Sequence, residues 1–345
     1  MRKVLLVTGS GRSGTSSAAG TLKRLGFHVP QPEVPTDEKN PRGYYEPLWV
    51  AQFHKEWLDG LGVRTIDGRP YAGEVALADL TPEREGRLRG WLAAELAARA
   101  ADDVVVVKET RAYWVYPLWQ RVVADAGAAL VSLTMLRHPA QVVRSRDAAY
   151  LSDWSDDLRR QREVANVAAW ANALFVTERA TRDNPRAFVP YPDLLADWRA
   201  AVTRACGQLG LDPGDLAAQH PVDDFLTASL NRSADTWEGL HVPDVLVDLA
   251  ERTWSAAQTL VLDPADSGAR TALDGLAQEY ADLHGTAVAV ASDETAAQVL
   301  AQKRALQERL AVKNERLDRL RRRVRELEAA AGPAAGPAEA TGEAR

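Results

Sequence analysis

The sequence predicts an α/β protein in which a P-loop-like parallel sheet is flanked by helices and followed by a C-terminal coiled-coil helix. Three observations carry this prediction. Short aliphatic and β-branched runs alternate with helical segments, the first run leads into a glycine-rich loop, and the last fifty residues follow a heptad pattern. We expect a catalytic domain over 1–290, a coiled-coil helix over 291–329, and a disordered tail rich in Ala, Gly and Pro over 330–345.

Four short apolar runs predict the strands. Three of them, Val4–Val7, Val104–Val107 and Leu130–Leu136, are almost continuously apolar, which is typical of a sheet covered on both faces, and Phe188–Tyr191 is a weaker fourth. The ends of neighbouring parallel strands meet at one edge of a sheet, so the residues that follow the first three runs should share one crevice. Helices are expected between and after the strands, at 116–126, 139–150, 160–182 and 194–209.

The loop after the first strand reads Gly9-Ser-Gly-Arg-Ser-Gly-Thr15, and we expect it to bind an anion. Its backbone N–H groups and the start of the next helix should point at one ligand, and its hydroxyl groups and Arg12 add donors and charge. A nucleoside-triphosphate loop would carry lysine where Thr15 stands. The expected binding residues are Gly11, Arg12, Ser13, Gly14, Thr15 and Ser16.

Basic residues also follow the next two strands. Lys108 comes directly after the second, where it either contacts a ligand or forms an ion pair with Glu109 or a helix acid. Arg137 follows the third strand, and Ser145 lies about two helical turns further on. An arginine fork suits a phosphate, and a serine hydroxyl can add a neutral hydrogen bond. We expect His138 to orient the turn at Arg137.

Composition limits the classes of function. The chain of 345 residues carries 42 basic and 48 acidic residues, a net charge of −6, which argues against a general nucleic-acid surface. The single cysteine, Cys206, excludes a disulfide framework and a cysteine-based metal site, and we expect its thiol to be buried. No apolar run approaches the roughly 18 residues of a membrane-spanning helix, so we expect a soluble cytoplasmic protein.

The last part of the chain has a heptad pattern typical of a coiled coil. Such a helix would join two subunits or dock the protein on a partner, and the alternative is one amphipathic helix that folds back on the domain. The two sets of core positions are Ala296, Lys303, Leu310, Leu317 and Val324, and Val299, Leu306, Lys313, Leu320 and Leu327.

Together the loop and the strand-end residues resemble the sulfotransferases that use 3′-phosphoadenosine 5′-phosphosulfate, in particular their bacterial branch. The sequence Arg-Ser-Gly-Thr-Ser at 12–16 is similar to the family's segment for the 5′-phosphosulfate. Arg137 and Ser145 are similar, in type and spacing, to its pair for the 3′-phosphate. The likeness covers most of residues 1–235, and supporting matches are the segments 40–46, 191–195 and 230–233.

The resemblance implies transfer of a sulfuryl group, without a metal, to a hydroxyl or amine of a small-molecule, carbohydrate or lipid acceptor. It implies donor-binding roles for Tyr191 and Arg232. Arg12 would stabilise the leaving 5′-phosphate, and Lys108 would bind the sulfuryl oxygens or the acceptor. Glu46, which ends a Gly-Tyr-Tyr-Glu segment, is the first choice for the general base. The alternative base is His54, which we otherwise expect at the surface.

Two departures from the family pattern stand out: Glu109-Thr110 replaces Asp-Pro after Lys108, and Pro192 replaces a glutamate. The rival functions are a P-loop small-molecule kinase and a non-catalytic sulfotransferase-like scaffold that acts through its coiled coil. Thr15 in the lysine position argues against the kinase, and the intact set of Arg12, Arg137 and Ser145 argues against the scaffold. The aromatic stripe of Trp49, Phe53 and Trp57 is expected to pack in the core.

Overall fold

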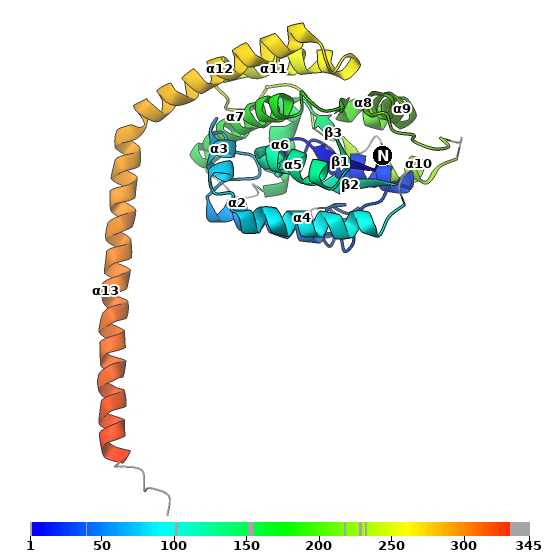
Figure 1. Cartoon of the computed structure of the whole chain (residues 1–345). Helices are drawn as coiled ribbons and strands as arrows, with labels where there is room; N and C mark the ends of the chain where they lie inside the picture. The colour runs from blue at the N-terminus through cyan, green and yellow to red at the C-terminus, as the bar shows by residue number, and fades with distance from the viewer. Residues whose placement is uncertain are drawn as a thin grey trace, which may run out of the picture. The chain divides into compact units, whose positions relative to one another are not determined.

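The computed structural model describes residues 2–38, 40–100, 103–150, 155–216, 219–227, 230–231 and 233–331 (Figure 1). The chain divides into two compact units, 1–284 and 285–345, which are treated separately below. From residue 332 on, the tail expected at 330–345 lies outside the described residues, and so does Arg232.

A four-stranded parallel sheet forms the centre of the first unit, as predicted. Its strands are β1 (Lys3–Thr8), β2 (Val104–Lys108), β3 (Ala129–Leu136) and β4 (Arg186–Pro190), in the order β2-β1-β3-β4. Within β1, Val7 pairs with Lys108 on one side and with Leu133 on the other. The carboxyl ends of β2, β1 and β3 therefore lie next to one another, at the edge where an open parallel sheet binds its ligands.

Helices follow most of the strands. The predictions at 116–126, 139–150 and 160–182 are confirmed. The segment 194–209 instead holds parts of two helices, α8 and α9, which are separated at Asp197. The Asp197 side chain caps α9 by accepting a hydrogen bond from the Ala200 N–H (3.0 Å). The helices are α1 (Thr15–Arg24), α2 (Leu48–Gly60), α3 (Ala72–Ala78), α4 (Pro82–Ala97), η1 (Ala112–Val115), α5 (Tyr116–Asp125), α6 (Pro139–Tyr150), α7 (Asp156–Ala180), α8 (Tyr191–Ala196), α9 (Trp198–Leu209), α10 (Pro221–Phe225), α11 (Asp244–Leu262), α12 (Ser267–Val290) and α13 (Ser292–Ala331).

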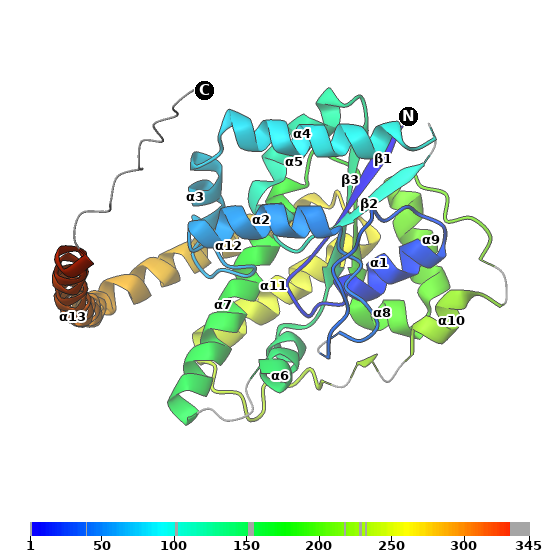
Figure 2. The same cartoon turned by 90° about the horizontal axis from the view of Figure 1, so that it is seen from below.

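Both faces of the sheet are buried, which explains why its strands lack polar alternation. In β1, Val4 and Leu6 pack with residues of α2, α4 and α5, while Leu5 and Val7 pack with α1 and α9 on the other face (Figure 2). All four side chains are fully buried, and each contributes about 1.5–3 kcal/mol of hydrophobic stabilisation. The helices on the two faces hold β1 in place and thereby position the loop that follows it.

The aromatic stripe on α2 is part of this core, as expected. Phe53 and Trp57 are buried, and Trp49 stacks against Phe53 and Trp91 at ring-centroid distances of 5.1 and 5.3 Å. The stripe therefore packs α2 against α4 and is not exposed for recognition of a ligand.

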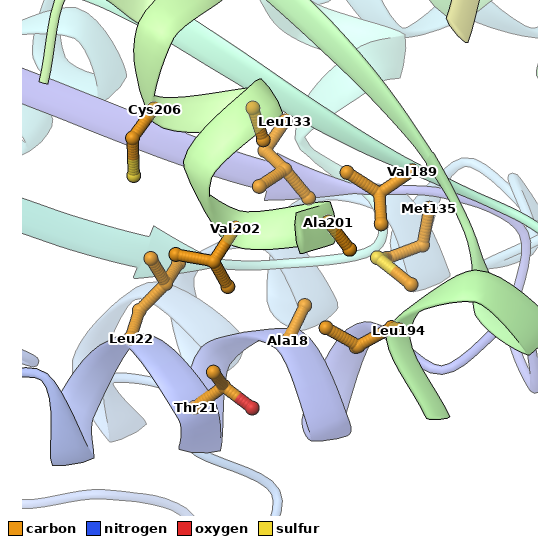
Figure 3. A pocket seen from close by; sticks show the side chains of 11 residues that line it. Ala18, Thr21, Leu22, Leu133, Met135, Val189, Leu194, Ala201, Val202 and Cys206 are labelled. Carbon is orange, nitrogen blue, oxygen red and sulfur yellow. The ribbon is translucent and has the colours of Figure 1, made fainter. Parts of the chain in front are cut away.

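A small cavity of about 20 Å³ lies between α1, α9 and the sheet (Figure 3). Its lining is almost wholly apolar and includes Cys206, which is buried as expected. Burial raises the pKa of the Cys206 thiol to about 11, so the thiol stays protonated near neutral pH. The space has about the volume of one water but too few polar partners to hold it, so it is a packing gap.

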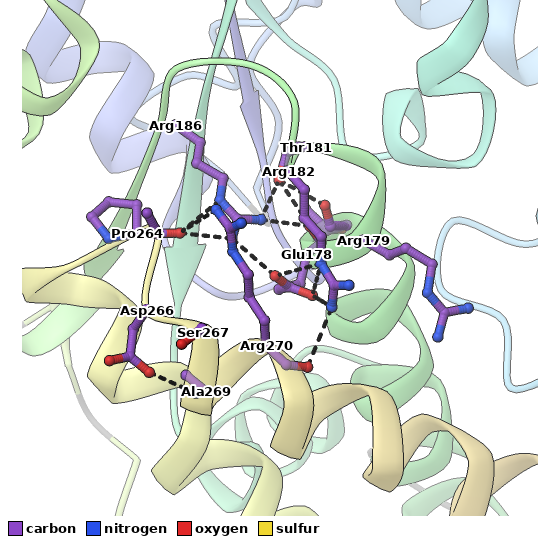
Figure 4. A network of polar contacts seen from close by, with 12 residues as sticks. Glu178, Arg179, Thr181, Arg182, Arg186, Pro264, Asp266, Ser267, Ala269 and Arg270 are labelled. Carbon is purple, nitrogen blue, oxygen red and sulfur yellow. Dashed lines mark hydrogen bonds and ion pairs between the residues drawn. The ribbon is translucent and has the colours of Figure 1, made fainter.

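A buried ionic network ties the start of β4 to the end of α7 and to the turn between α11 and α12 (Figure 4). The Glu178 carboxylate accepts from Arg182 (3.0 Å) and from Arg186 (2.9 Å). Arg186 also donates to the Pro264 carbonyl (2.7 Å). Because Glu178 and Arg186 are almost fully buried, loss of the Glu178 carboxylate would leave the Arg186 charge without a counter-charge and cost about 3–5 kcal/mol.

The second unit contains α13, one helix of 40 residues that confirms the helix expected over 291–329. Its pairing into a coiled coil stays a prediction. In the part of the chain that the structure describes, no helix combines the length and the apolarity needed to cross a bilayer.

Candidate active site

The glycine-rich loop joins β1 to α1, and two of its glycines are required by geometry. Gly9 has φ +139°, and a Cβ there would lie 2.7 Å from the Met135 carbonyl. Gly14 has φ +92°, and a Cβ there would lie 2.1 Å from the ring of Tyr191. No side chain caps the start of α1 within the described residues, so its first N–H groups are available to an anion.

Arg12 sits in the loop with a left-handed backbone, φ +76°, which is costly for a side chain other than glycine. Its Nε donates to the Ser145 hydroxyl (3.1 Å), and its carbonyl accepts from Arg137 Nη1 (2.9 Å). The loop after β1 and the turn after β3 are thus joined through these three residues. The structure brings together Arg12, Arg137 and Ser145, as the shared crevice predicts.

Arg137 is a buried cation, with only 5% of its surface exposed. Its other hydrogen bonds go to neutral acceptors, Asn231 Oδ1 (2.7 Å) and Gln141 Oε1 (3.4 Å). Burial lowers the pKa of its guanidinium, and the charge of Arg12 lowers it further. Among the described residues, neither arginine forms an ion pair with a carboxylate. A buried charge without a counter-charge is expensive, so this cluster is suited to an anionic ligand.

Tyr191 closes the loop from the side of β4. Its ring packs on Gly14 and lies 4.9 Å from the Arg137 guanidinium carbon, a cation–π contact. The residue begins α8, and Pro192 therefore stands in the first helical turn, where a missing N–H removes no helix hydrogen bond. The departure from the family pattern at Pro192 is compatible with the local structure.

Ser16 and the segment 40–46 connect the loop to the second half of the site. Asn40 Nδ2 donates to the Ser16 hydroxyl (3.2 Å) and to the Gly43 carbonyl (2.7 Å). The segment then leads to Glu46, which lies just before α2. One stretch of chain therefore fixes both the start of α1 and the position of the candidate base.

Glu46 forms an ion pair with Lys108 at the end of β2. Lys108 is almost fully buried, whereas 13% of the Glu46 side chain is exposed. Burial raises the pKa of Glu46 above its ordinary value, Lys108 opposes this, and the nearby Glu109 adds to it. Lys108 therefore pairs with Glu46, the candidate base, and not with its neighbour Glu109.

Glu109 is fully buried and belongs to a separate pair. Its carboxylate accepts from Arg111 Nε (2.8 Å) and Nη2 (3.0 Å). Burial alone would raise the pKa of Glu109, but His54 and Arg111 hold it at about 2, so the carboxylate stays ionised. The Glu109-Thr110-Arg111 turn is thus a structural support beneath Lys108.

The expectation that His54 lies at the surface was wrong, because the residue is completely buried. Its Nε2 accepts the indole N–H of Trp119 (3.3 Å), and its Nδ1 faces Glu109 Oε2 at 3.9 Å. Because an indole can only donate, Nε2 accepts this hydrogen bond and carries no proton. His54 is thus enclosed in the core, whereas part of the Glu46 side chain is exposed, so of the two candidate bases Glu46 is the accessible one.

Sequence reasoning missed the residues that hold Arg137 from outside the motifs. Trp170 on α7 donates to the Arg137 carbonyl (3.1 Å). Glu251 on α11 lies 3.0 Å from His138 Nε2 and accepts from Trp237 Nε1 (2.5 Å). His138 thus anchors the turn, as expected, but through an acid more than 100 residues away. Asn231, which accepts from Arg137, could have been found from the sequence, because it lies in the segment 230–233 next to the predicted Arg232.

No protein-family model matches the chain, and no curated protein matches it. Solved structures that are similar to it include the following three. The sulfotransferase domain of the olefin synthase from Synechococcus PCC 7002 shares 18% identity at a TM-score of 0.42, over 72% of this chain and 93% of that one. A sulfotransferase domain from the curacin biosynthetic pathway shares 16% identity at 0.35, over 70% and 82%. Sulfotransferase STF1 from Mycobacterium tuberculosis H37Rv shares 17% at 0.36, over 65% and 73%.

All three proteins are named as sulfotransferases or sulfotransferase domains, the family that the sequence motifs resemble. At these TM-scores and identities the likeness carries no argument about activity. The case for a function therefore rests on the residues of the site.

Proposed function

We propose that the chain is a sulfotransferase that uses 3′-phosphoadenosine 5′-phosphosulfate and modifies a hydroxyl or amine of a small-molecule, carbohydrate or lipid acceptor. The observation that carries the proposal is the buried Arg137 beside Arg12, two cations that no carboxylate neutralises among the described residues. Arg137 is held in place by Asn231 and by the Arg12 carbonyl, so it is ready for an anion without a large rearrangement.

The sulfuryl donor carries a phosphate at the ribose 3′ position and a phosphosulfate at the 5′ position, and the site offers one set of hydrogen-bond donors for each. The N–H groups of residues 11–15 and the Arg12 side chain would hold the 5′-phosphosulfate. Arg137 and Ser145 would hold the 3′-phosphate. Tyr191 would keep Arg137 and the loop in register through its ring contacts. Arg232, another residue predicted to bind the donor, lies outside the described residues.

Glu46 would act as the general base and Arg12 as the group that stabilises the leaving oxygen. When bound, the donor supplies the sulfuryl group that is transferred. Glu46 accepts the proton of the acceptor hydroxyl while that oxygen forms its bond to sulfur. Arg12 and the loop N–H groups stabilise the negative charge that grows on the 5′-phosphate oxygen as its bond to sulfur breaks. Lys108 keeps Glu46 oriented and adds a positive charge near the transferred oxygens.

A sulfuryl group carries less negative charge than a terminal phosphoryl group, and this explains why the loop needs no lysine. The metal ion and lysine of kinases neutralise charge on the transferred phosphate. Here Thr15 occupies the lysine position, and Arg12 is the charged residue of the loop. Independence from a metal and a cytoplasmic location stay predictions.

Calorimetric titration of the purified chain tests the proposal. We expect adenosine 3′,5′-bisphosphate, the product of the donor, to bind with a Kd of about 1–10 µM in the presence of a chelator, and ATP with Mg²⁺ to bind at least about tenfold more weakly. Preference for ATP with Mg²⁺ would favour the kinase. Binding of neither nucleotide would favour the non-catalytic scaffold.

A further inference from the structure

Helix α13 carries an apolar stripe, interrupted by Lys303 and Lys313, which is here called the α13 stripe. The stripe is exposed in the single chain, with exposed fractions between 48% and 63%. Isolated apolar side chains at a surface are ordinary, but a stripe maintained over more than four heptads indicates a binding face. Its members are Val299, Leu306, Leu310, Leu317, Leu320, Val324 and Leu327.

Basic residues border the stripe. If Leu310 and Leu317 are taken as heptad position a, the flanking positions g and e hold Arg309, Arg316, Arg321 and Arg323, together with Asn314 and Glu328. Between residues 309 and 328 there are eight basic and four acidic residues, in a chain whose net charge is −6. The apolar face is therefore lined by positive charge at the positions that select a coiled-coil partner.

Most of the acidic residues of this region lie away from the stripe. Asp318 and Glu326 occupy outer positions, where they form exposed ion pairs with Arg321 (3.6 Å) and Arg323 (3.2 Å). Exposed pairs of this kind contribute about 0–1 kcal/mol, so they do not hold the two arginines against a better partner.

A second copy of α13 fits this face poorly. In a parallel pair, Arg316 at position g would face Arg321 at position e of the other copy, although Arg323 would face Glu328. In an antiparallel pair the g positions face one another, and three of them are arginines. Lys303 and Lys313 also stand at core positions, so two copies in parallel register would bury each lysine against its own equivalent.

We propose that the α13 stripe binds an amphipathic helix of another protein, with apolar residues at its core positions and Asp or Glu at its flanking positions. Acidic flanks would pair with Arg309, Arg316 and Arg321, and the long side chains of Lys303 and Lys313 would extend from the core to the same flanking carboxylates. The role follows from α13 alone and does not depend on the proposed transferase activity.

The test uses the full-length chain and two designed peptides. Both peptides carry Val at position a and Leu at position d over five heptads, with Glu at every e and g position in one and Lys in the other. We expect the Glu peptide to bind at least about tenfold more tightly than the Lys peptide at about 0.15 M ionic strength, as measured by fluorescence anisotropy. Sedimentation should show the unliganded chain as a monomer at the concentrations used.

A charge-reversed variant provides the matched control. The combined changes R309E, R316E, R321E and R323E leave the apolar stripe intact and should invert the preference, so that the Lys peptide binds more tightly. The changes L310S and L317S should abolish binding of either peptide, with helix content checked by circular dichroism. Equal binding of the two peptides, no binding, a dimeric chain, or tighter binding to DNA or to anionic lipid vesicles than to the Glu peptide would overturn the proposal.

Discussion

The two halves of the candidate site differ in how their charges are balanced. On the side of β1 and β3, Arg12 and Arg137 lie together, and their partners among the described residues are neutral. On the side of β2, Lys108 is paired with Glu46, and Arg111 is paired with Glu109. Both halves are largely buried, so the unbalanced half needs an anion and the balanced half does not. In the function proposed above, the first half would bind the donor and the second would transfer the proton.

The largest effect is expected from the balanced half. Glu46→Gln removes the base, so kcat should fall about 10²- to 10⁴-fold with an acceptor that the wild-type chain uses, while binding of adenosine 3′,5′-bisphosphate changes little. Because this change leaves Lys108 unpaired, Glu46→Asp serves as a second variant that keeps the charge but moves it back. It should fold like the wild type and still lose rate.

A control for these variants is Glu279→Gln, which removes an exposed carboxylate of α12 that is paired with Arg252 of α11. It should leave kcat unchanged. Full activity of both Glu46 variants would exclude Glu46 as the base.

The pH dependence of the rate tests the role of Glu46 in the same half of the site. Burial raises the pKa of Glu46 above its ordinary 4.5, and a base must be deprotonated to act. The value of kcat/KM should therefore fall on the acid side, by about tenfold per pH unit, with a midpoint above 4.5. Glu46→Gln should remove this limb. A rate that stays constant down to pH 4.5 would contradict the assignment.

A smaller effect is expected when the unbalanced half is given a counter-charge. Asn231→Asp places a carboxylate on Arg137 Nη2, where Asn231 Oδ1 now accepts. It should weaken binding of adenosine 3′,5′-bisphosphate about tenfold, because the 3′-phosphate then competes with an attached anion. The matched control is Asn184→Asp, whose side chain contacts Tyr116 instead. An unchanged affinity would show that Asn231 lies apart from the anion.

The smallest effect is expected from Ser145, which offers a neutral hydroxyl. Ser145→Ala removes a bond of about 0.5–1.5 kcal/mol, so affinity for the bisphosphate should fall about two- to tenfold, as measured by calorimetry. Ser255→Ala, on the exposed face of α11, should have no effect. A loss at Ser145 as large as that expected for an arginine would mean that the hydroxyl has a different role.

Much of the fold follows from local patterns. The four strands were predicted because each is a short apolar run, and their shared edge then placed Arg12, Arg137 and Ser145 together. Helix α4 was not predicted, although Leu88, Leu92 and Leu96 are spaced along one helix face and Thr81 and Pro82 mark its start. The motifs therefore located the loop and strand ends better than the helices around them.

The pairings within the site depend on packing between distant segments. Glu46 and Lys108 are 62 residues apart, and Arg137 and Asn231 are 94 apart. Nothing in the local sequence says that Lys108 pairs with Glu46 and not with its neighbour Glu109. The burial of His54 likewise follows from the packing of α2 against α5, where its ring lies 5.9 Å from that of Trp119, and a pattern of single residues does not reveal it.

The most direct test of the central claim is calorimetric titration of wild-type and Arg137→Ala chains with two nucleotides, adenosine 3′,5′-bisphosphate and adenosine 5′-monophosphate. If Arg137 holds the 3′-phosphate, the variant should lose about 100-fold in affinity for the bisphosphate and change little toward the monophosphate. Arg121→Ala, an exposed arginine on α5, should change neither affinity. Equal losses for both nucleotides, or wild-type affinity of the variant for the bisphosphate, would contradict the account.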